Sequence, residues 1–252
     1  MPDLAQNLSE RGFAVFDRDL RVARWATRAY EQAKTVTSDP ALRAAWLRHG
    51  QTWFVGVDVL PNDATGAIDA VALAGPWLDH VTPPVHWHSA QVSVIYRGFP
   101  QQDPDETDGA HRYRIKRAGA HVDGLHLEQG RRIVRECHDF ILGLPLNDAR
   151  GCPLVVWEGS HTIMRAALRA AAGKGDPRGA DVTEAYKTAR EAVFEHCTPV
   201  AVMADPGQSI LLDRQVLHGI SPDMGEPELP DEGRMVAYFR PECANPQDWL
   251  LG

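Results

Sequence analysis

Apolar residues near the start of the chain recur at helical spacing. Between residues 20 and 33 the repeat is i, i+3, i+4, i+7, and it consists of Val22, Trp25, Ala26, Ala29, Tyr30 and Ala33. This spacing predicts an amphipathic helix with one buried face. A second helix is expected to begin at Asp39-Pro40, with Asp39 as the cap and Pro40 in the first turn, and to end near Gly50.

After residue 52 the hydrophobic pattern changes to short runs rich in β-branched and aromatic residues. The predicted strands are residues 52–55, 91–96, 140–144, 154–157, 200–203, 209–212 and 235–239. Turn-forming residues such as Asn147-Asp148 and Asp205-Pro206-Gly207 separate them. The pattern predicts a mainly β fold, a β-sandwich or jelly roll, with the N-terminal helices packed outside it.

One stretch interrupts the strands. Residues 162–172 and 181–197 have helical patterns, separated by a break rich in Gly, Asp and Pro at 173–179. We interpret residues 162–197 as a helical insertion between two strands, because so short a segment cannot bury a core alone. There is no internal repeat and no obvious linker, so the whole chain, 1–252, is predicted to be a single domain.

Composition and charge narrow the class of protein. The 252 residues carry a formal net charge of −8, with 44% hydrophobic and 24% charged residues, as is ordinary for globular proteins. An acidic balance disfavours a broad surface for nucleic acid or anionic membranes. The one basic stretch, residues 111–117, is interpreted as the solvated face of a strand. We therefore expect a small molecule as partner, with neither nucleic acid nor membrane; nothing indicates an oligomeric state.

The N-terminal residues and the cysteines indicate no special location, disulfide framework or zinc site. The first residues have no basic flank followed by an apolar segment, and no apolar run reaches the length of a transmembrane helix. The four cysteines are widely spaced, without a C-x-x-C pair, so neither a disulfide framework nor a structural zinc site is indicated. The expected location is the cytoplasm.

The candidate chemistry lies in His121-Val122-Asp123. If this tripeptide is on a strand, residues i and i+2 project from one face and aim an imidazole and a carboxylate at one point. His218, shortly after the predicted strand at 209–212, is the candidate third ligand. Two histidines and one carboxylate form the facial triad of non-haem iron(II) oxygenases, which leaves positions open for dioxygen and a co-substrate.

A His-x-Asp tripeptide does not by itself distinguish a metal site from a surface or core histidine. The chain has eleven histidines and thirty-four acidic residues, so the pattern can arise by chance. His86 and His88 form a rival pair in a loop-like context after two prolines, without a carboxylate at the matching position. The order of further motifs along the chain is therefore needed to support the triad.

Three segments in order resemble the phytanoyl-CoA dioxygenase family of iron(II)/2-oxoglutarate oxygenases. They are HVDG at 121–124, GCPLVVWEGSH at 151–161, and PGQSILLD at 206–213 leading to His218-Gly219 and Arg234, with a faint echo in ERGFAV at 10–15. The resemblance implies a double-stranded β-helix, cupin-like, with Fe(II), 2-oxoglutarate and O2 as cofactors. It implies that His121, Asp123 and His218 hold the iron and that Arg234 binds the distal carboxylate of 2-oxoglutarate.

The chain also departs from the family pattern. Glu158 replaces the usual Pro of the second motif, and an acidic, proline-rich loop lengthens the gap from His218 to Arg234. The second 2-oxoglutarate contact stays open between Tyr113 and Ser221. Trp157 is the candidate substrate-binding residue, although a tryptophan in a strand also fits core packing.

The expected function is oxidation of a small organic molecule, most simply hydroxylation of an unactivated C–H bond, with succinate and CO2 as co-products. The helical insertion is a candidate lid over the substrate. Two alternatives stay open. One is a cupin-type isomerase or lyase that uses no 2-oxoglutarate, and the other is a non-catalytic member of the fold that only binds a small molecule.

Overall fold

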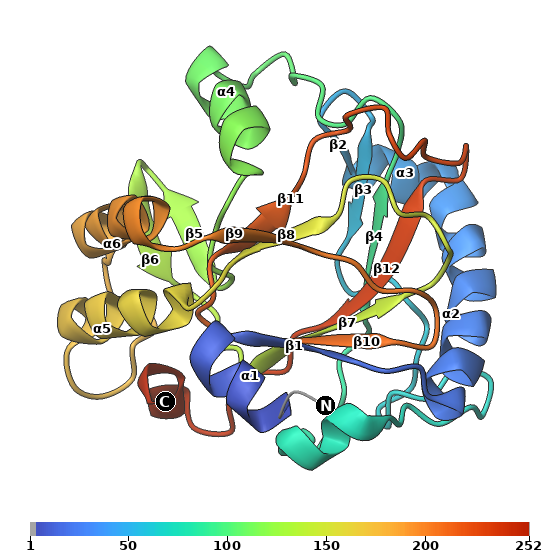
Figure 1. The fold of residues 1–252 in the computed structure, drawn as a ribbon, viewed down its shortest axis with the longest axis horizontal. Helices are drawn as coiled ribbons and strands as arrows, with labels where there is room; N and C mark the ends of the chain where they lie inside the picture. The colour runs from blue at the N-terminus through green and yellow to red at the C-terminus, as the bar shows by residue number, and fades with distance from the viewer. Residues whose placement is uncertain (1–3, 252) are drawn as a thin grey trace.

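The computed structural model describes residues 4–251 (Figure 1). The helices are α1 (Leu4–Arg11), α2 (Leu20–Ser38), α3 (Pro40–Trp46), η1 (Pro76–His80), α4 (Asp108–Arg117), α5 (Ser160–Ala172), α6 (Thr183–His196) and η2 (Pro246–Leu250). The strands are β1 (Phe13–Phe16), β2 (Leu47–Arg48), β3 (Trp53–Gly56), β4 (Gln91–Ile95), β5 (Leu125–Glu128), β6 (Arg131–Val134), β7 (Phe140–Pro145), β8 (Leu154–Trp157), β9 (Pro199–Val202), β10 (Ser209–Asp213), β11 (His218–Ile220) and β12 (Arg234–Phe239).

Two antiparallel sheets face each other and form a jelly roll. The larger has the order β1-β10-β7-β12-β4-β3-β2, the smaller has the order β11-β8-β9, and β5 and β6 form a separate hairpin. Ile141 and Ile210 of the large sheet share one buried cluster with Leu154 and Val156 of the small sheet. The prediction of a double-stranded β-helix is confirmed.

The central strand β12 shows how the alternation of residues builds two layers. Met235, Ala237 and Phe239 face outward into the main core, where the Phe239 ring lies 5.6 Å from that of Trp25 on α2. The alternate residues Arg234 and Tyr238 therefore point into the space between the sheets. Helix packing on one side and a second sheet on the other explain why this strand is buried on both faces.

Helix α2 covers the outer face of the large sheet (Figure 1). Its predicted apolar stripe is confirmed, and the helix continues beyond the predicted residue 33 to Ser38. Asp19 caps it by accepting a hydrogen bond from the backbone N–H of Arg21 at 2.7 Å. The same carboxylate pairs with the Arg21 guanidinium, and this hydrogen bond is the main reason that its pKa falls to about 2.

We expect Asp19→Ala to lower the free energy of unfolding by about 1 kcal/mol at pH 7, because the cap and its charge are lost. The pKa of Asp19 is about 2 in the fold against 3.8 in the reference state. The unfolded chain therefore takes up this proton first as the pH falls, and the difference between wild type and variant should shrink between pH 4 and pH 2. Urea denaturation at pH 7, 4 and 3 measures it, with the exposed Asp17→Ala as control. A difference that is independent of pH would contradict the ionic contribution.

The predicted helical insertion is confirmed as α5 and α6. Met164 and Leu168 of α5 and Val193 of α6 are buried together with Trp157 of β8, so the two helices pack on the outer face of the small sheet. Figure 1 shows them at the end of the molecule opposite α2. None of the helices in residues 4–251 is long and apolar enough to cross a bilayer.

Two local predictions were wrong. The basic stretch 111–117 lies in helix α4, not in a strand; Thr107 caps this helix through its hydroxyl, and the helix has no fully buried residue. Without a buried face, it shows no hydrophobic period that could identify it in the sequence. The second helix ends at Trp46 rather than near Gly50, because Leu47 and Arg48 pair with β3 instead.

Candidate metal centre

Two histidines that are far apart in the sequence are joined by an isolated β-bridge. His121 and His218 exchange both backbone hydrogen bonds, with N–O distances of 2.8 and 3.0 Å. Directly paired residues of antiparallel strands project from the same face. The two imidazole rings accordingly lie 4.8 Å apart, centroid to centroid.

Asp123 completes the group. Its Oδ1 lies 3.1 Å from Nε2 of His121 and 3.9 Å from Nε2 of His218, and the three donor atoms all lie within 4.8 Å of one another. The tripeptide is not part of a regular strand: only His121 is bridged, and Asp123 starts a turn. Gly124 in that turn has φ +81°, and a Cβ there would approach the carbonyl oxygen of Glu136 to 2.2 Å. The turn therefore requires glycine.

The hydrogen bonds of the two imidazole rings show which nitrogen of each ring is directed at the site. Nδ1 of His121 lies 3.0 Å from the carbonyl oxygen of Gly119, and Nδ1 of His218 lies 3.0 Å from that of Val216. A carbonyl oxygen can only accept, so each Nδ1 carries a hydrogen, and each Nε2 is the ring nitrogen that faces Asp123. This is how backbone carbonyls orient histidine ligands in metal sites.

Charge in the triad also suits a divalent cation. Burial lowers the pKa of His218 to about 4, so its ring is neutral near pH 7. Burial alone would raise the pKa of Asp123, but the hydrogen bond with His121 and the charges around it hold this pKa well below its usual range. Nη1 of Arg240 contributes from 3.5 Å. The donor set is thus one carboxylate and imidazole nitrogens.

A pocket of about 150 Å³ lies between the two sheets beside the triad. It is lined by Trp53, Val55, Val57, Gln91, Ser93, His121, Asp123, Ile141, Leu154, His218, Gly219, Ile220, Tyr238 and Arg240. One wall is apolar and the wall from β4 and β12 is polar, with Tyr238 opposite Gln91 in the strand register. Such a pocket can hold a small, partly polar molecule next to a metal.

Arg234 and Tyr238 have buried polar atoms without partners. Within residues 4–251, neither Nε of Arg234 nor the hydroxyl of Tyr238 has a hydrogen-bond partner. Arg234 is 9% exposed and does not itself line the pocket, but its positive charge opposes the burial that raises the pKa of Tyr238. Because unpaired buried donors are costly, two together indicate a place where an anion is expected.

The other predicted site residues lie elsewhere. The Tyr113 hydroxyl donates to the Ala120 carbonyl at 2.7 Å, and the side chain packs against the buried cluster that contains Trp157. Ser221 lines a separate surface pocket with Cys152, and the Trp157 ring packs 5.5 Å from that of Phe194 on α6. The structure does not bring these three side chains to the triad, and their proposed roles stay predictions.

Tyr238 and Arg240 line the pocket but are not among the site residues expected from the sequence. The alternation of polar and apolar residues in the strand at 234–239 could have identified them. Arg234, Tyr238 and Arg240 are separated by even numbers of residues. In an extended segment all three therefore project from the same face, opposite to the apolar Met235 and Phe239. Polar residues on the inner face of a strand that is buried on both sides indicate a site rather than solvent exposure.

Comparisons with known proteins identify the fold. No protein-family model matches the sequence, and no curated protein matches it. Among solved structures, the non-heme alpha ketoglutarate dependent carbocyclase SnoK from nogalamycin biosynthesis is 14% identical, with a TM-score of 0.54, covering 97% of this chain and 88% of that one. EvdMO1 is also 14% identical, with a TM-score of 0.50, covering 94% and 49%. EctD from S. alaskensis with bound Fe is 17% identical, with a TM-score of 0.47, covering 93% and 74%. At such identities the likeness to SnoK and EvdMO1 shows the fold alone.

Proposed function

We propose that this protein is an iron(II)- and 2-oxoglutarate-dependent oxygenase. The observation that carries the proposal is the convergence of His121, Asp123 and His218 at the wall of a pocket between the sheets of a jelly roll. These three residues would hold the metal from one side and would leave its other positions for dioxygen and 2-oxoglutarate, as oxygen-activating iron(II) sites require. The resemblance to the phytanoyl-CoA dioxygenase family, and the fold shared with an alpha ketoglutarate dependent enzyme, support the same function.

The side chains fit iron(II) in three respects. The donor set of imidazole nitrogens and one carboxylate suits it, each Nδ1 is tied to a backbone carbonyl, and each Nε2 faces the Asp123 carboxylate, where the metal would be bound. When bound, iron(II) would supply the oxidation of substrate by O2, coupled to conversion of 2-oxoglutarate to succinate and CO2. The task of the protein is to orient both molecules beside this position and to exclude water.

Arg234 and Tyr238 are proposed to receive the distal carboxylate of 2-oxoglutarate. A guanidinium stays charged when buried and matches a carboxylate with two parallel N–H donors, and a phenol adds a third donor. The unpartnered Nε and hydroxyl described above are the support for this assignment. Tyr238 thereby becomes the proposed second contact, in place of Tyr113 and Ser221, whose side chains lie outside the pocket.

The proposed reaction is hydroxylation of an unactivated C–H bond of a small organic molecule. Asp123 supports this outcome because it fills the third protein position with a carboxylate, so that no halide is needed there as ligand. The apolar side chains of Val55, Ile141 and Leu154 provide a wall without reactive groups beside the triad. A C–H bond of the substrate is then the nearest group available for oxidation.

Anaerobic titration of the protein with iron(II) and 2-oxoglutarate tests this function. We expect a weak visible charge-transfer band from the chelated keto acid. Arg234→Gln should weaken 2-oxoglutarate binding by about a hundredfold, because a charge-assisted bidentate pair is lost and the remaining donors are neutral. Tyr238→Phe should have a smaller effect of the same sign, and iron(II) affinity should be unchanged in both variants.

Arg150→Gln serves as the matched control, because this arginine is surface-exposed and pairs with Asp205 away from the pocket. No band in wild type, together with intact iron binding, would favour a cupin-type enzyme that uses no 2-oxoglutarate. Loss of iron binding from a correctly folded wild type would favour a non-catalytic binding protein. Either result would refute the proposed function.

A further inference from the structure

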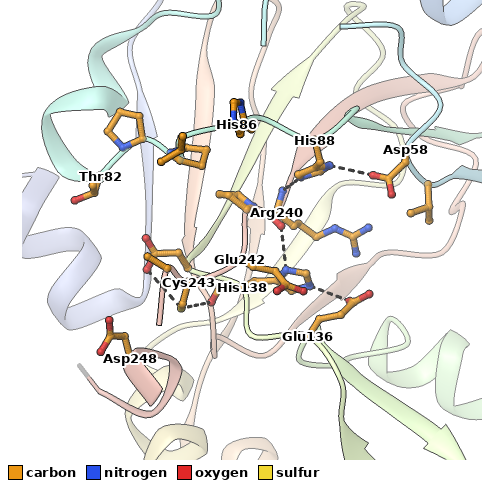
Figure 2. Close-up of a pocket in the computed structure, with 17 residues that line it drawn as sticks. Asp58, Thr82, His86, His88, Glu136, His138, Arg240, Glu242, Cys243 and Asp248 are labelled. Carbon is orange, nitrogen blue, oxygen red and sulfur yellow. Dashed lines mark hydrogen bonds and ion pairs between the residues drawn. The ribbon is translucent and has the colours of Figure 1, made fainter. Parts of the chain in front are cut away.

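A second, larger cleft adjoins the metal pocket. It has a volume of about 780 Å³ and shares Val57 and Arg240 with the inner pocket. Figure 2 shows its two sides: the loop from Thr82 to His86 on one, and Glu136, His138 and Glu242 on the other. The volume lies in the range of small-molecule sites, whereas the inner pocket of about 150 Å³ has little room beyond the keto acid.

The boundary between the two spaces is held in place by hydrogen bonds (Figure 2). The backbone N–H of Arg240 donates to Nε2 of His88 at 2.8 Å, and its carbonyl oxygen lies 3.0 Å from Nδ1 of His138. Each histidine is in turn held by a carboxylate: Asp58 is 3.0 Å from His88, and Glu136 is 3.1 Å from His138. His88, a rival metal-ligand candidate in the sequence, thus has a structural partner. Preformed walls lower the entropic cost of binding.

The charge of the cleft is strongly negative. Five carboxylates line it against a single arginine, Arg240, and they are Asp58, Glu136, Asp139, Glu242 and Asp248. Three of the five have partners, because Asp139 pairs with Arg214 at 2.8 Å and the other two bind the histidines described above. Glu242 and Asp248 make no ion pair or side-chain hydrogen bond with residues 4–251. These two carboxylates are therefore available to a ligand.

Apolar residues complete the cleft. Pro83, Pro84 and Val85 line it together with the carboxylates, and Val85 is 90% exposed although it is apolar. Val57 continues the apolar surface to the junction with the metal pocket. A molecule that matches this surface has an aliphatic segment next to a positively charged group.

We propose that this cleft is the substrate site and that the substrate carries an amine or guanidinium group bound by Glu242 and Asp248. This inference rests on the proposed function, and it adds the substrate class and orientation. The positive charge of Arg240 at the junction repels a cation, so the charged end lies away from the triad. The aliphatic end then passes Val57 and presents its C–H bonds to the metal.

Ligand-observed NMR with hexylamine tests the charge preference. The amine should bind more tightly than the neutral 1-hexanol and the anionic hexanoate, and its affinity should fall with added salt. The double variant Glu242→Gln/Asp248→Asn should bind hexylamine about tenfold more weakly, from two partly exposed ion pairs. The control Glu184→Gln/Glu191→Gln, with the same charge change on the exposed face of α6, should bind like wild type.

Orientation is tested by replacing iron with manganese(II) and measuring relaxation of the hexylamine protons. The methyl end should relax faster than the aminomethyl end. Equal binding of the three probes, unchanged affinity of the double variant, or faster relaxation at the aminomethyl end would overturn the proposal. The keto-acid charge-transfer band needs no substrate, so it reports separately on whether the proposed function itself fails.

Discussion

Asp123→Ala is expected to weaken iron(II) binding by more than about a hundredfold and to abolish turnover. Loss of an outer partner of a metal ligand alone costs about 10–100-fold in affinity, and Asp123 is the only anionic donor of the group. The variant also leaves the guanidinium of Arg240, now 3.5 Å from the Asp123 carboxylate, facing the metal position without a countercharge. Both changes act against a divalent cation.

Anaerobic calorimetric titration with iron(II) measures this effect. Asp123→Asn separates charge from shape, and it should lose nearly as much affinity as the alanine variant because an amide is a neutral, weaker donor. Asp176→Ala is the control, since this carboxylate pairs with Arg178 on the surface. Iron affinity within threefold of wild type in Asp123→Ala would mean that the ligand set is wrong.

Gly219→Ala is expected to lower the free energy of unfolding by about 3 kcal/mol or more. Gly219 lies next to His218 in β11, and a Cβ there would approach the carbonyl oxygen of Ala118 to 2.1 Å. The new Cβ is fixed to the backbone of β11, and the Ala118 oxygen is itself a backbone atom, so no side-chain rotation can relieve the clash. The segment before His121 must therefore separate from β11. The bridge that pairs His121 with His218 should open at the same time.

Thermal denaturation measures the first effect, with an expected fall in Tm of roughly 6–12 °C. Iron titration measures the second, and affinity should fall even at temperatures where the variant is folded. Gly109→Ala is the matched control: it lies in α4, with only the Thr107 hydroxyl 3.9 Å from the new Cβ, and it should be neutral or slightly stabilising. A Gly219→Ala variant with wild-type Tm and iron affinity would contradict the role of this close approach.

The elements that could be predicted are those with a strong hydrophobic period. Helix α2 has a continuous buried stripe, and β4, β7 and β10 are apolar runs bounded by turn residues. Helix α4 could not be identified, because its register depends on single contacts such as the hydrogen bonds from Arg114 to Glu106 rather than on a buried face. Short pairings such as β2 with β3 have too few residues to show a period.

The hypothesis that the helical insertion is a lid depends on where the insertion packs, which the sequence does not specify. The sequence places a helical pair between β8 and β9, but it does not tell on which side of the small sheet that pair packs. The structure buries α5 and α6 against the outer side, around Trp157 and Val193, and neither helix lines either pocket. The loop from Thr82 to His86, without any secondary-structure period, borders the larger cleft instead.

The sequence by itself determined the strand-rich architecture, the helical insertion and the identity of the three candidate metal ligands, because local periodicity and motif order are properties of neighbouring residues. Only the tertiary structure decided that His121 and His218 are directly paired across a bridge, that Tyr238 joins Arg234 on an inner face, and that a negatively charged cleft meets the metal pocket at Arg240. These facts depend on strand register and on the packing of segments distant in the chain, which no local pattern encodes.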